Sequence, residues 1–155
     1  MRSSLWVMVG VLFCGMMPSS AQAALDRELQ QVQGRWRVTD IRIGQGWGEA
    51  EAQIRMTLQT IRLVINKDQV SAEIEGTPTG QAARLQVDSR PRPKVANLVT
   101  KNADGTEVVL KGIYSLEGGT LKFYFGFEAR PAKFPSETGG QDLLITLERE
   151  KPQGR

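Results

Sequence analysis

The side chains that most often carry catalysis are scarce in this chain of 155 residues. It has no histidine, and its single cysteine is Cys14. Ser-His-Asp catalysis, Cys-His catalysis and histidine-ligated zinc all need an imidazole, so the sequence excludes them. Any acid–base step would have to use carboxylates, tyrosine or lysine. From these residues we expect neither a metal site nor a cofactor.

Two glutamates, Glu73 and Glu75, stand two residues apart in a predicted strand and therefore share one of its faces. A carboxyl group that acts as a general acid needs burial to raise its pKa, whereas this face of the strand is the polar one. The pair is better explained as a solvated surface than as a catalytic dyad. The chain also lacks a Gly-x-Ser-x-Gly elbow and a phosphate-binding loop motif. We expect a protein that is not an enzyme.

A glycine-rich stretch at 44–48 follows a predicted strand and precedes a predicted helix, as a dinucleotide-binding loop does. That fingerprint needs a further glycine where this chain has Glu49. Glu49 and Glu51 at the start of a helix would also repel a phosphate group. We interpret the stretch as a flexible loop.

Positive charge is concentrated in one short segment, where Arg90, Arg92 and Lys94 occupy three of five positions. These cations could bind an acidic glycan or a lipid headgroup, but a solvated connector near Asp88 is the simpler interpretation. The whole chain has a net charge of +3, from 20 basic and 17 acidic residues. This excess is small and scattered, so we expect no nucleic-acid partner.

The first 23 residues have the pattern of a secretory signal peptide. Arg2 precedes an uncharged apolar run over 5–17, and an Ala-Gln-Ala sequence ends at Ala23. The run is shorter than the roughly 20 residues that a membrane span needs. We therefore predict a signal peptide over 1–23, a single exported domain over 24–155 in the periplasm or outside the cell, and no stable membrane span after cleavage. An uncleaved anchor is the alternative. Lipoprotein anchoring through Cys14 is not favoured, because Phe13 before it is bulky.

The rest of the chain has the periodicity of short strands with two short helices. A helix is predicted over 24–33 and a second over 48–59, from apolar residues at helical spacing. Strands are predicted over 34–43, 61–65, 70–74, 83–87, 95–100, 108–116, 120–127 and 143–149. In the first strand the apolar phase slips after Val38, which indicates a bulge. Short, evenly spaced strands are typical of an antiparallel sandwich or barrel, and closure would remove exposed edges. The predicted fold is all-β, an eight-stranded antiparallel barrel.

Gly34-Arg35-Trp36 opens the first strand after a short helix and resembles the G-x-W signature of lipocalins and related calycins. The resemblance implies that Trp36 plugs the closed end of the barrel and that an arginine from the last strand, here Arg149, packs over it. Such a cation–π contact is worth on the order of 0.5–2 kcal/mol.

A closer resemblance joins four stretches, 29–38, 112–121, 130–134 and 143–150, to a small family of exported lipocalin-like domains described mostly from planctomycete bacteria. It covers roughly residues 25–150 and implies a lipocalin-like barrel without an assigned activity. Two departures stand out. The family's Gly-Asp turn is Gly118-Gly119 here, and its Ile-Asp-Leu in the fifth strand is 96–98, Ala-Asn-Leu.

Aromatic residues are the candidate ligand contacts. Tyr114, Phe123 and Phe125 could line an apolar cavity or fill a narrow barrel completely, and the sequence leaves both open. Trp47 is a candidate residue at the barrel mouth, and simple packing of the nearby helix is the alternative.

The long predicted loop at 128–142 contains two further candidate contacts, Arg130 and Phe134. Unstructured loops of this length are often functional. In the structural alternative, Phe134 folds back against the barrel and Arg130 meets a carboxylate. The predicted function is non-catalytic binding of a small apolar or amphipathic ligand. The alternative is a filled-barrel module for protein–protein or envelope interactions, whose protein partners the sequence does not identify.

Overall fold

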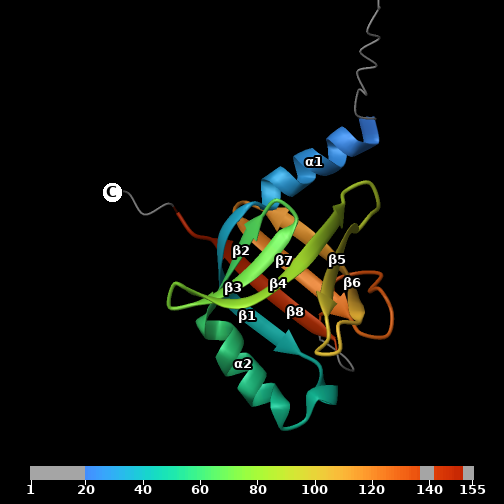
Figure 1. Ribbon diagram of the computed structural model, residues 1–155. Helices are drawn as coiled ribbons and strands as arrows, with labels where there is room; N and C mark the ends of the chain where they lie inside the picture. Colours follow the sequence, from blue (N-terminus) through green and yellow to red (C-terminus); the bar gives the residue numbers. More distant parts are fainter. Residues whose placement is uncertain (1–19, 137–141, 152–155) are drawn as a thin grey trace, which may run out of the picture.

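Eight antiparallel strands form a closed barrel in which each strand pairs with the next and β8 returns to β1 (Figure 1). The computed structural model describes residues 20–136 and 142–151. The strands are β1 (Gly34–Ile43), β2 (Ile61–Asn66), β3 (Gln69–Ile74), β4 (Thr77–Asp88), β5 (Lys94–Lys101), β6 (Glu107–Glu117), β7 (Thr120–Gly126) and β8 (Leu143–Arg149). The predicted all-β, eight-stranded lipocalin-like barrel with short helices is confirmed.

The helices lie at opposite ends of the barrel. Helix α1 (Ser20–Val32) precedes β1, whereas the 3-10 turn η1 (Gln45–Trp47) and helix α2 (Ala50–Thr60) follow it. Because β1 crosses the barrel between them, α1 lies where β1 begins and α2 lies where β1 ends (Figure 1). Both helices match their predictions within a few residues. Helix α1 starts at Ser20 and so continues across the predicted cleavage point after Ala23, while residues 1–19 of the predicted signal peptide lie outside the described residues.

None of the helices in the described part of the chain has the length and apolar character needed to span a membrane.

Strand β1 contains the predicted bulge. Trp36 and Val38 are buried in the barrel, and after them Ile41 and Ile43 are buried. The register with β8 shifts between Val38 and Asp40, which absorbs the extra residue. This irregularity keeps four large apolar side chains of one strand inside the same core.

Strand β4 differs from its prediction. The predicted strands 70–74 and 83–87 leave the Gly-Thr-Pro-Thr-Gly sequence at 76–80 as a break between them, but β4 already begins at Thr77. In its register with β3, Pro78 faces Glu73 and Ala82 faces Ser71. Residues 79–81 therefore stand opposite a single residue, and Gly80 within them has a φ of +79°. The turn-forming residues make a wide bulge inside a strand, because a glycine at positive φ allows the chain to bend there.

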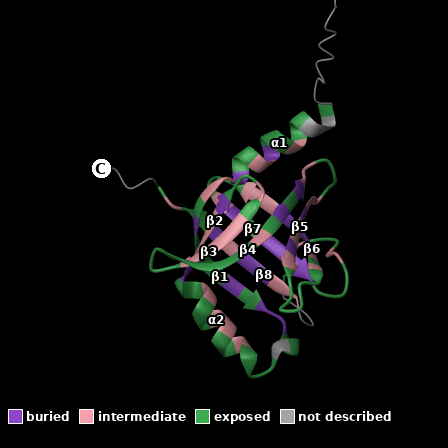
Figure 2. Cartoon of the chain, viewed as in Figure 1, coloured by how far each residue is buried: buried purple, intermediate pink, exposed green. Residues whose placement is uncertain are grey.

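The main core extends from Val32 and Trp36 at the α1 end to Ile43 at the α2 end. Figure 2 shows buried segments along the strands, with exposed residues on α2 and on the first half of β4. The largest fully buried side chains include Trp36, Tyr114, Leu85, Leu121 and Leu147. A second, smaller cluster lies apart from this core and is formed by Ile113, Tyr124 and Leu144 with Phe134.

Candidate functional site

The α1 end of the barrel is closed by Trp36. Its side chain is fully buried, and its indole Nε1 donates a hydrogen bond of 2.9 Å to the carbonyl of Val32 in α1. The guanidinium carbon of Arg149 lies 4.3 Å from the ring centroid, and its nitrogens donate to the carbonyls of Gln31 and Gln33. A side chain at Gly34 would approach Arg149, since a Cβ there would lie 3.1 Å from Nη1. This is the arrangement that the G-x-W resemblance implies.

A buried carboxylate also holds α1 on the barrel. The Tyr114 hydroxyl and the Lys94 ammonium each donate a 2.6 Å hydrogen bond to Oε1 of Glu28, which is 7% exposed. Burial raises the pKa of Glu28, but the hydrogen bonds from Lys94 and Tyr114 and the charge of Lys94 outweigh it and hold this pKa below its usual value. Burial, together with the Glu28 carboxylate, raises the pKa of Tyr114.

Glu28 was missed in the sequence analysis, although its spacing gave a signal. It falls between Leu25 and Val32 on the helical stripe that contains Leu29, at the i, i+3, i+4 and i+7 positions. An acidic residue on an apolar stripe that packs against a core indicates a buried partner, which proves to be Lys94 and Tyr114 together.

The predicted aromatic residues lie in the filled part of the core. Tyr114 and Phe123 have ring centroids 6.1 Å apart, and Phe123 stacks on Phe125 at 5.6 Å. All three are buried. Gly112 makes room for Phe125, because a Cβ at this glycine would lie 2.5 Å from the Phe125 ring. These rings therefore fill this part of the barrel.

Two inward-facing leucines of β5 and β6 are only partly buried, although Ile43 and Phe125 at the α2 end are buried. Leu98 of β5 pairs with both Leu85 of β4 and Leu110 of β6, so all three side chains point into the barrel. Leu85 is 1% exposed, whereas Leu98 and Leu110 are half-buried. The other partly buried residues of this group that touch the core are Leu63, Leu143, Ile54 and Leu58. Apolar side chains are therefore incompletely covered on the β5–β6 side of the barrel.

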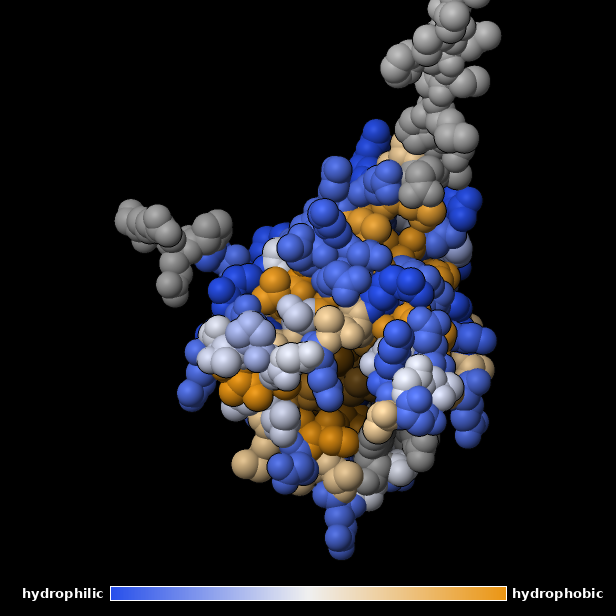
Figure 3. Space-filling view, viewed as in Figure 1, coloured by the Kyte–Doolittle hydropathy of each residue, from blue (hydrophilic) through white to orange (hydrophobic). Residues whose placement is uncertain are grey.

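The wall of the barrel is also incomplete beside these leucines. The pairing of β4 with β5 runs from Asp88 to Arg84 and ends there, so among the described residues 77–83 pair only with β3. Figure 3 shows an apolar hollow in this part of the surface, between the β3–β4 side and the β5–β6 side. We call this hollow, with Leu63, Leu98, Leu110 and Leu143 from the barrel, the open-end hollow.

Arg130 and Phe134 lie on the outside of the barrel, away from the open-end hollow. Arg130 donates hydrogen bonds to the carbonyl of Gly112, at 2.6 Å, and to Oδ1 of Asn97, at 2.8 Å. It thus binds carbonyl and amide oxygens, not the carboxylate that the structural alternative assumed. Phe134 packs on Tyr124, with centroids 6.5 Å apart. Residues 137–141 of the loop lie outside the described residues.

Tyr124, beneath this loop, is tied to Asp142. Its hydroxyl donates a 2.6 Å hydrogen bond to the Asp142 carboxylate. Burial and this hydrogen bond raise the pKa of Tyr124 to about 12. The carbonyl of Asp142 accepts a hydrogen bond from Gly44 at the end of β1, so the described end of the loop is anchored at the open end. The backbone of Trp47 belongs to η1 nearby, but its side chain lies outside the described residues.

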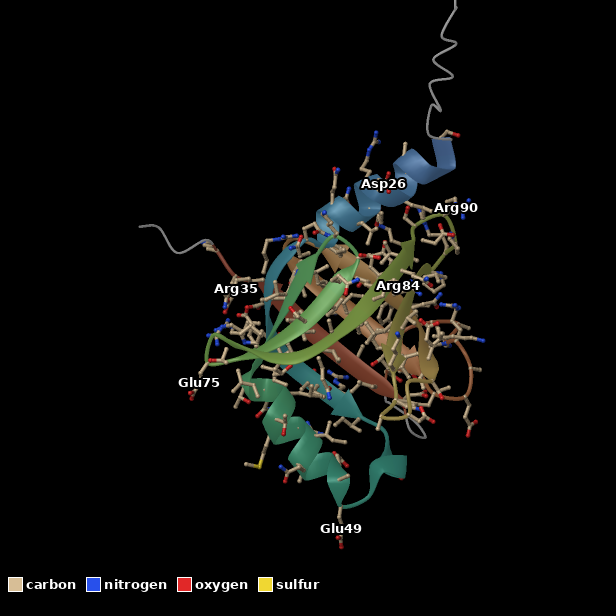
Figure 4. All side chains as sticks on the ribbon, viewed as in Figure 1. Asp26, Arg35, Glu49, Glu75, Arg84 and Arg90 are labelled. Atoms are coloured by element: carbon tan, nitrogen blue, oxygen red, sulfur yellow. The ribbon has the colours of Figure 1, made fainter. Side chains whose placement is uncertain are left out.

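The cations of the 90–94 connector bind neighbouring groups of the same chain. Arg90 donates two hydrogen bonds to the Asp88 carboxylate, and these lower the pKa of Asp88 to about 2. Arg92 donates to the carbonyls of Ser89 and Pro91. Figure 4 shows Arg90 beside α1, at the end of the barrel opposite Glu49. Within the described ranges, no group of three or more metal-ligating side chains comes together.

Together these features define a lipocalin-like barrel that is plugged by Trp36 and α1 at one end and leaves leucines half-buried beside the end of the β4–β5 pairing. No family model, curated protein or solved structure matches this chain. Membership of the exported lipocalin-like family remains a prediction from the four sequence stretches.

Proposed function

We propose that this protein is a non-catalytic, exported barrel that binds a small apolar or amphipathic ligand in the open-end hollow. The observation that supports this proposal is the difference between Leu85 and Leu98. They are register partners and both point inward, yet Leu85 is buried whereas Leu98 on β5 is left half-buried. Partly exposed leucines that converge in a concave site are typical of small-molecule pockets.

The ligand that fits this site has a flexible apolar part. The named wall residues are leucines, and the stacked Phe123 and Phe125 lie further inside the barrel. Burial of an alkyl chain contributes about 0.8 kcal/mol per methylene group, so about six methylenes would supply roughly 5 kcal/mol before the entropy cost of binding.

Native mass spectrometry of the protein, purified gently from its own cell envelope, tests this proposal. We expect a small-molecule mass that stays with the folded chain and is lost on denaturation. The proposal would be overturned if every preparation gave the mass of the bare chain and the protein also failed to take up added decanol.

A filled-barrel interaction module is the second candidate, and one surface feature favours it. A cleft of about 870 Å³ lies on the outer wall where β1, β2 and the end of β8 meet, and charged side chains line it. Ion pairs cross it between Arg62 and Glu150, at 2.5 Å, and between Arg37 and Glu148, at 3.1 Å. Figure 4 shows Arg35 and Glu75 on this side of the barrel. This candidate predicts that native mass spectrometry detects a second protein in place of a small molecule.

A further inference from the structure

The gap between β4 and β5 has a specific structural cause. The wide bulge at 79–81 places three residues of β4 opposite the single Ala72 of β3. Beyond Arg84, the first half of β4 therefore leaves β5, and residues 77–82 are exposed. The lateral opening is continuous with the open-end hollow, since Leu98 and Leu110 lie next to it in the register. We call it the β4–β5 seam.

Arg84 stands at the inner end of this seam with unused hydrogen-bonding capacity. Among the described arginines, only Arg84 and Arg27 donate no hydrogen bond, whereas those on β1, β2 and β8 all do. Within the described residues its one charged contact is Glu107, 3.8 Å from Nη2, and its side chain is 46% exposed. A guanidinium whose N–H groups are not engaged can bind a planar anion by donating two parallel hydrogen bonds to it.

A second cation lies on the other side of the seam. Lys101 ends β5, is exposed, and has no ion-pair partner within the described residues. The first half of β4, residues 77–83, contributes no acidic residue. Asp104, in the turn after β5, accepts a 2.9 Å hydrogen bond from the backbone of Thr106. Arg84 on β4 and Lys101 on β5 therefore flank the seam. Glu107, 3.8 Å from Arg84, lies beside them.

We propose that the ligand is a single-chain amphiphile with an anionic head. Its alkyl chain occupies the open-end hollow, and its head lies in the β4–β5 seam against Arg84 and Lys101. This inference rests on the proposed function and adds the chemical class of the ligand. The seam also gives the alkyl chain a lateral entrance to the barrel interior, while the anionic head, which is too polar to be buried, stays at the barrel wall.

The test compares three probes, each titrated into the full-length protein by calorimetry at pH 7. Decanoate has both the alkyl chain and the anionic head, decanol has the chain without the charge, and acetate has the charged head without the chain. We expect decanoate to bind about tenfold more tightly than decanol, because one charge-assisted contact is worth about 1.4 kcal/mol or more. Acetate at the same concentration should not compete. Arg84→Gln should abolish the preference for decanoate, and Lys101→Gln should reduce it about threefold. The matched control is Arg37→Gln, which removes an arginine that is 59% exposed and ion-paired on β1.

Equal affinity for decanoate and decanol would overturn this inference, as would an Arg84→Gln variant that keeps the preference. The proposed function would survive either result, because decanol would still bind. If neither probe binds, the proposed function itself fails, so the two failures are distinguishable.

The seam can also be tested by closing it. Deletion of Thr79 and Gly80 leaves Gln81 alone opposite Ala72, which makes the β3–β4 ladder regular. We expect β4 to continue along β5, the one amide of Thr100 and Lys101 that faces β4 to become more protected from hydrogen exchange, and the affinity for decanoate to fall about tenfold. The control, Thr79→Ala with Gln81→Ala, keeps the bulge and should bind normally. A folded deletion variant with wild-type affinity would contradict the seam; if that variant does not fold, the Arg84→Gln comparison decides.

Discussion

The two ends of this barrel share the same strands but are closed by different means. At the α1 end, the helix contributes the buried Val32 and Glu28, and both contact residues of the barrel. At the α2 end, the helix has no buried residue. The comparison shows that a regular ladder of eight strands does not by itself decide whether a barrel is filled. The side chains that a helix brings to each opening decide it.

The two helices also differ in how they are attached. Helix α1 is fixed by a buried carboxylate with two donors and by the indole of Trp36. Helix α2 is held by Arg55, which donates a 2.9 Å hydrogen bond to the carbonyl of Ile41, and by the partial burial of Ile54 and Leu58. Fewer buried contacts mean a lower free energy of local opening. We therefore expect the α2 end to be the more dynamic end of the molecule.

The largest effect should come from removing the plug. Trp36→Ala should reduce the free energy of unfolding by about 3–5 kcal/mol, because it leaves a cavity in a fully buried site. Urea denaturation followed by circular dichroism measures this. The control from the other end is Met56→Ala on α2, whose side chain is 69% exposed and which should change stability by less than about 0.5 kcal/mol. A loss below about 1 kcal/mol for Trp36→Ala would contradict the plug.

The sharpest matched pair is Leu85 and Leu98, because these residues are direct register partners. Leu85→Ala should cost about 2–5 kcal/mol of stability, whereas Leu98→Ala should cost about 1 kcal/mol, since its side chain already faces solvent in part. Binding should show the opposite order, with Leu98→Ala weakening decanol binding and Leu85→Ala leaving it nearly unchanged. Equal losses of stability would mean that Leu98 is packed as completely as Leu85, which would contradict the incomplete filling beside Leu98.

A pH titration of stability tests the carboxylate that holds α1. The folded-state pKa of Glu28 is below its usual value of 4.5, so its ionised form stabilises the fold above that pH. This stabilisation is lost as the pH falls from 4.5 through the folded-state pKa. Glu28→Gln should lower stability at pH 7 by about 1–3 kcal/mol, because Lys94 loses its charged acceptor. The variant should also have a shallower decline below pH 4.5 in urea denaturation. An unchanged decline would show that Glu28 does not contribute.

The smallest effect is expected at the α2 tether. Arg55→Ala should cost about 0.5–1 kcal/mol globally, because it removes a hydrogen bond from a side chain that is only partly buried. Its main consequence should be faster hydrogen exchange confined to α2. If protection fell equally in α1, the two helices would belong to one cooperative unit and the comparison between the ends would be wrong.

Much of the fold could be predicted because it depends on local patterns. The alternation of apolar residues in eight short segments indicated the strands, and the phase slip after Val38 indicated the bulge that the register with β8 shows. The Gly-Pro-rich sequence at 76–80 misled the prediction, because the same residue types serve loops and bulges. Only the pairing with β3 distinguishes the two.

The candidate site was harder to predict, since burial depends on distant partners. Tyr114 and Phe123 are aromatic residues of the kind that line ligand cavities. Tyr114, however, binds Glu28 of α1, and both rings are buried in the core. The open-end hollow is lined by leucines that no spacing rule separates from core leucines. Leu98 is only half-buried because β4 bends away from β5 near its partner Leu85, and this bend follows from a bulge in β4.

Methyl-group NMR of leucine-labelled protein during a titration with decanol tests the central claim most directly, because it reports both ends of the barrel in one experiment. We predict saturable chemical-shift changes for the methyls of Leu98, Leu110 and Leu63 at the open end, with little change for Leu85 and Leu121 in the filled core. Saturable shifts in the core leucines, or no saturable shift anywhere, would contradict the account of a barrel that is plugged beside α1 and open to a ligand beside the end of the β4–β5 pairing.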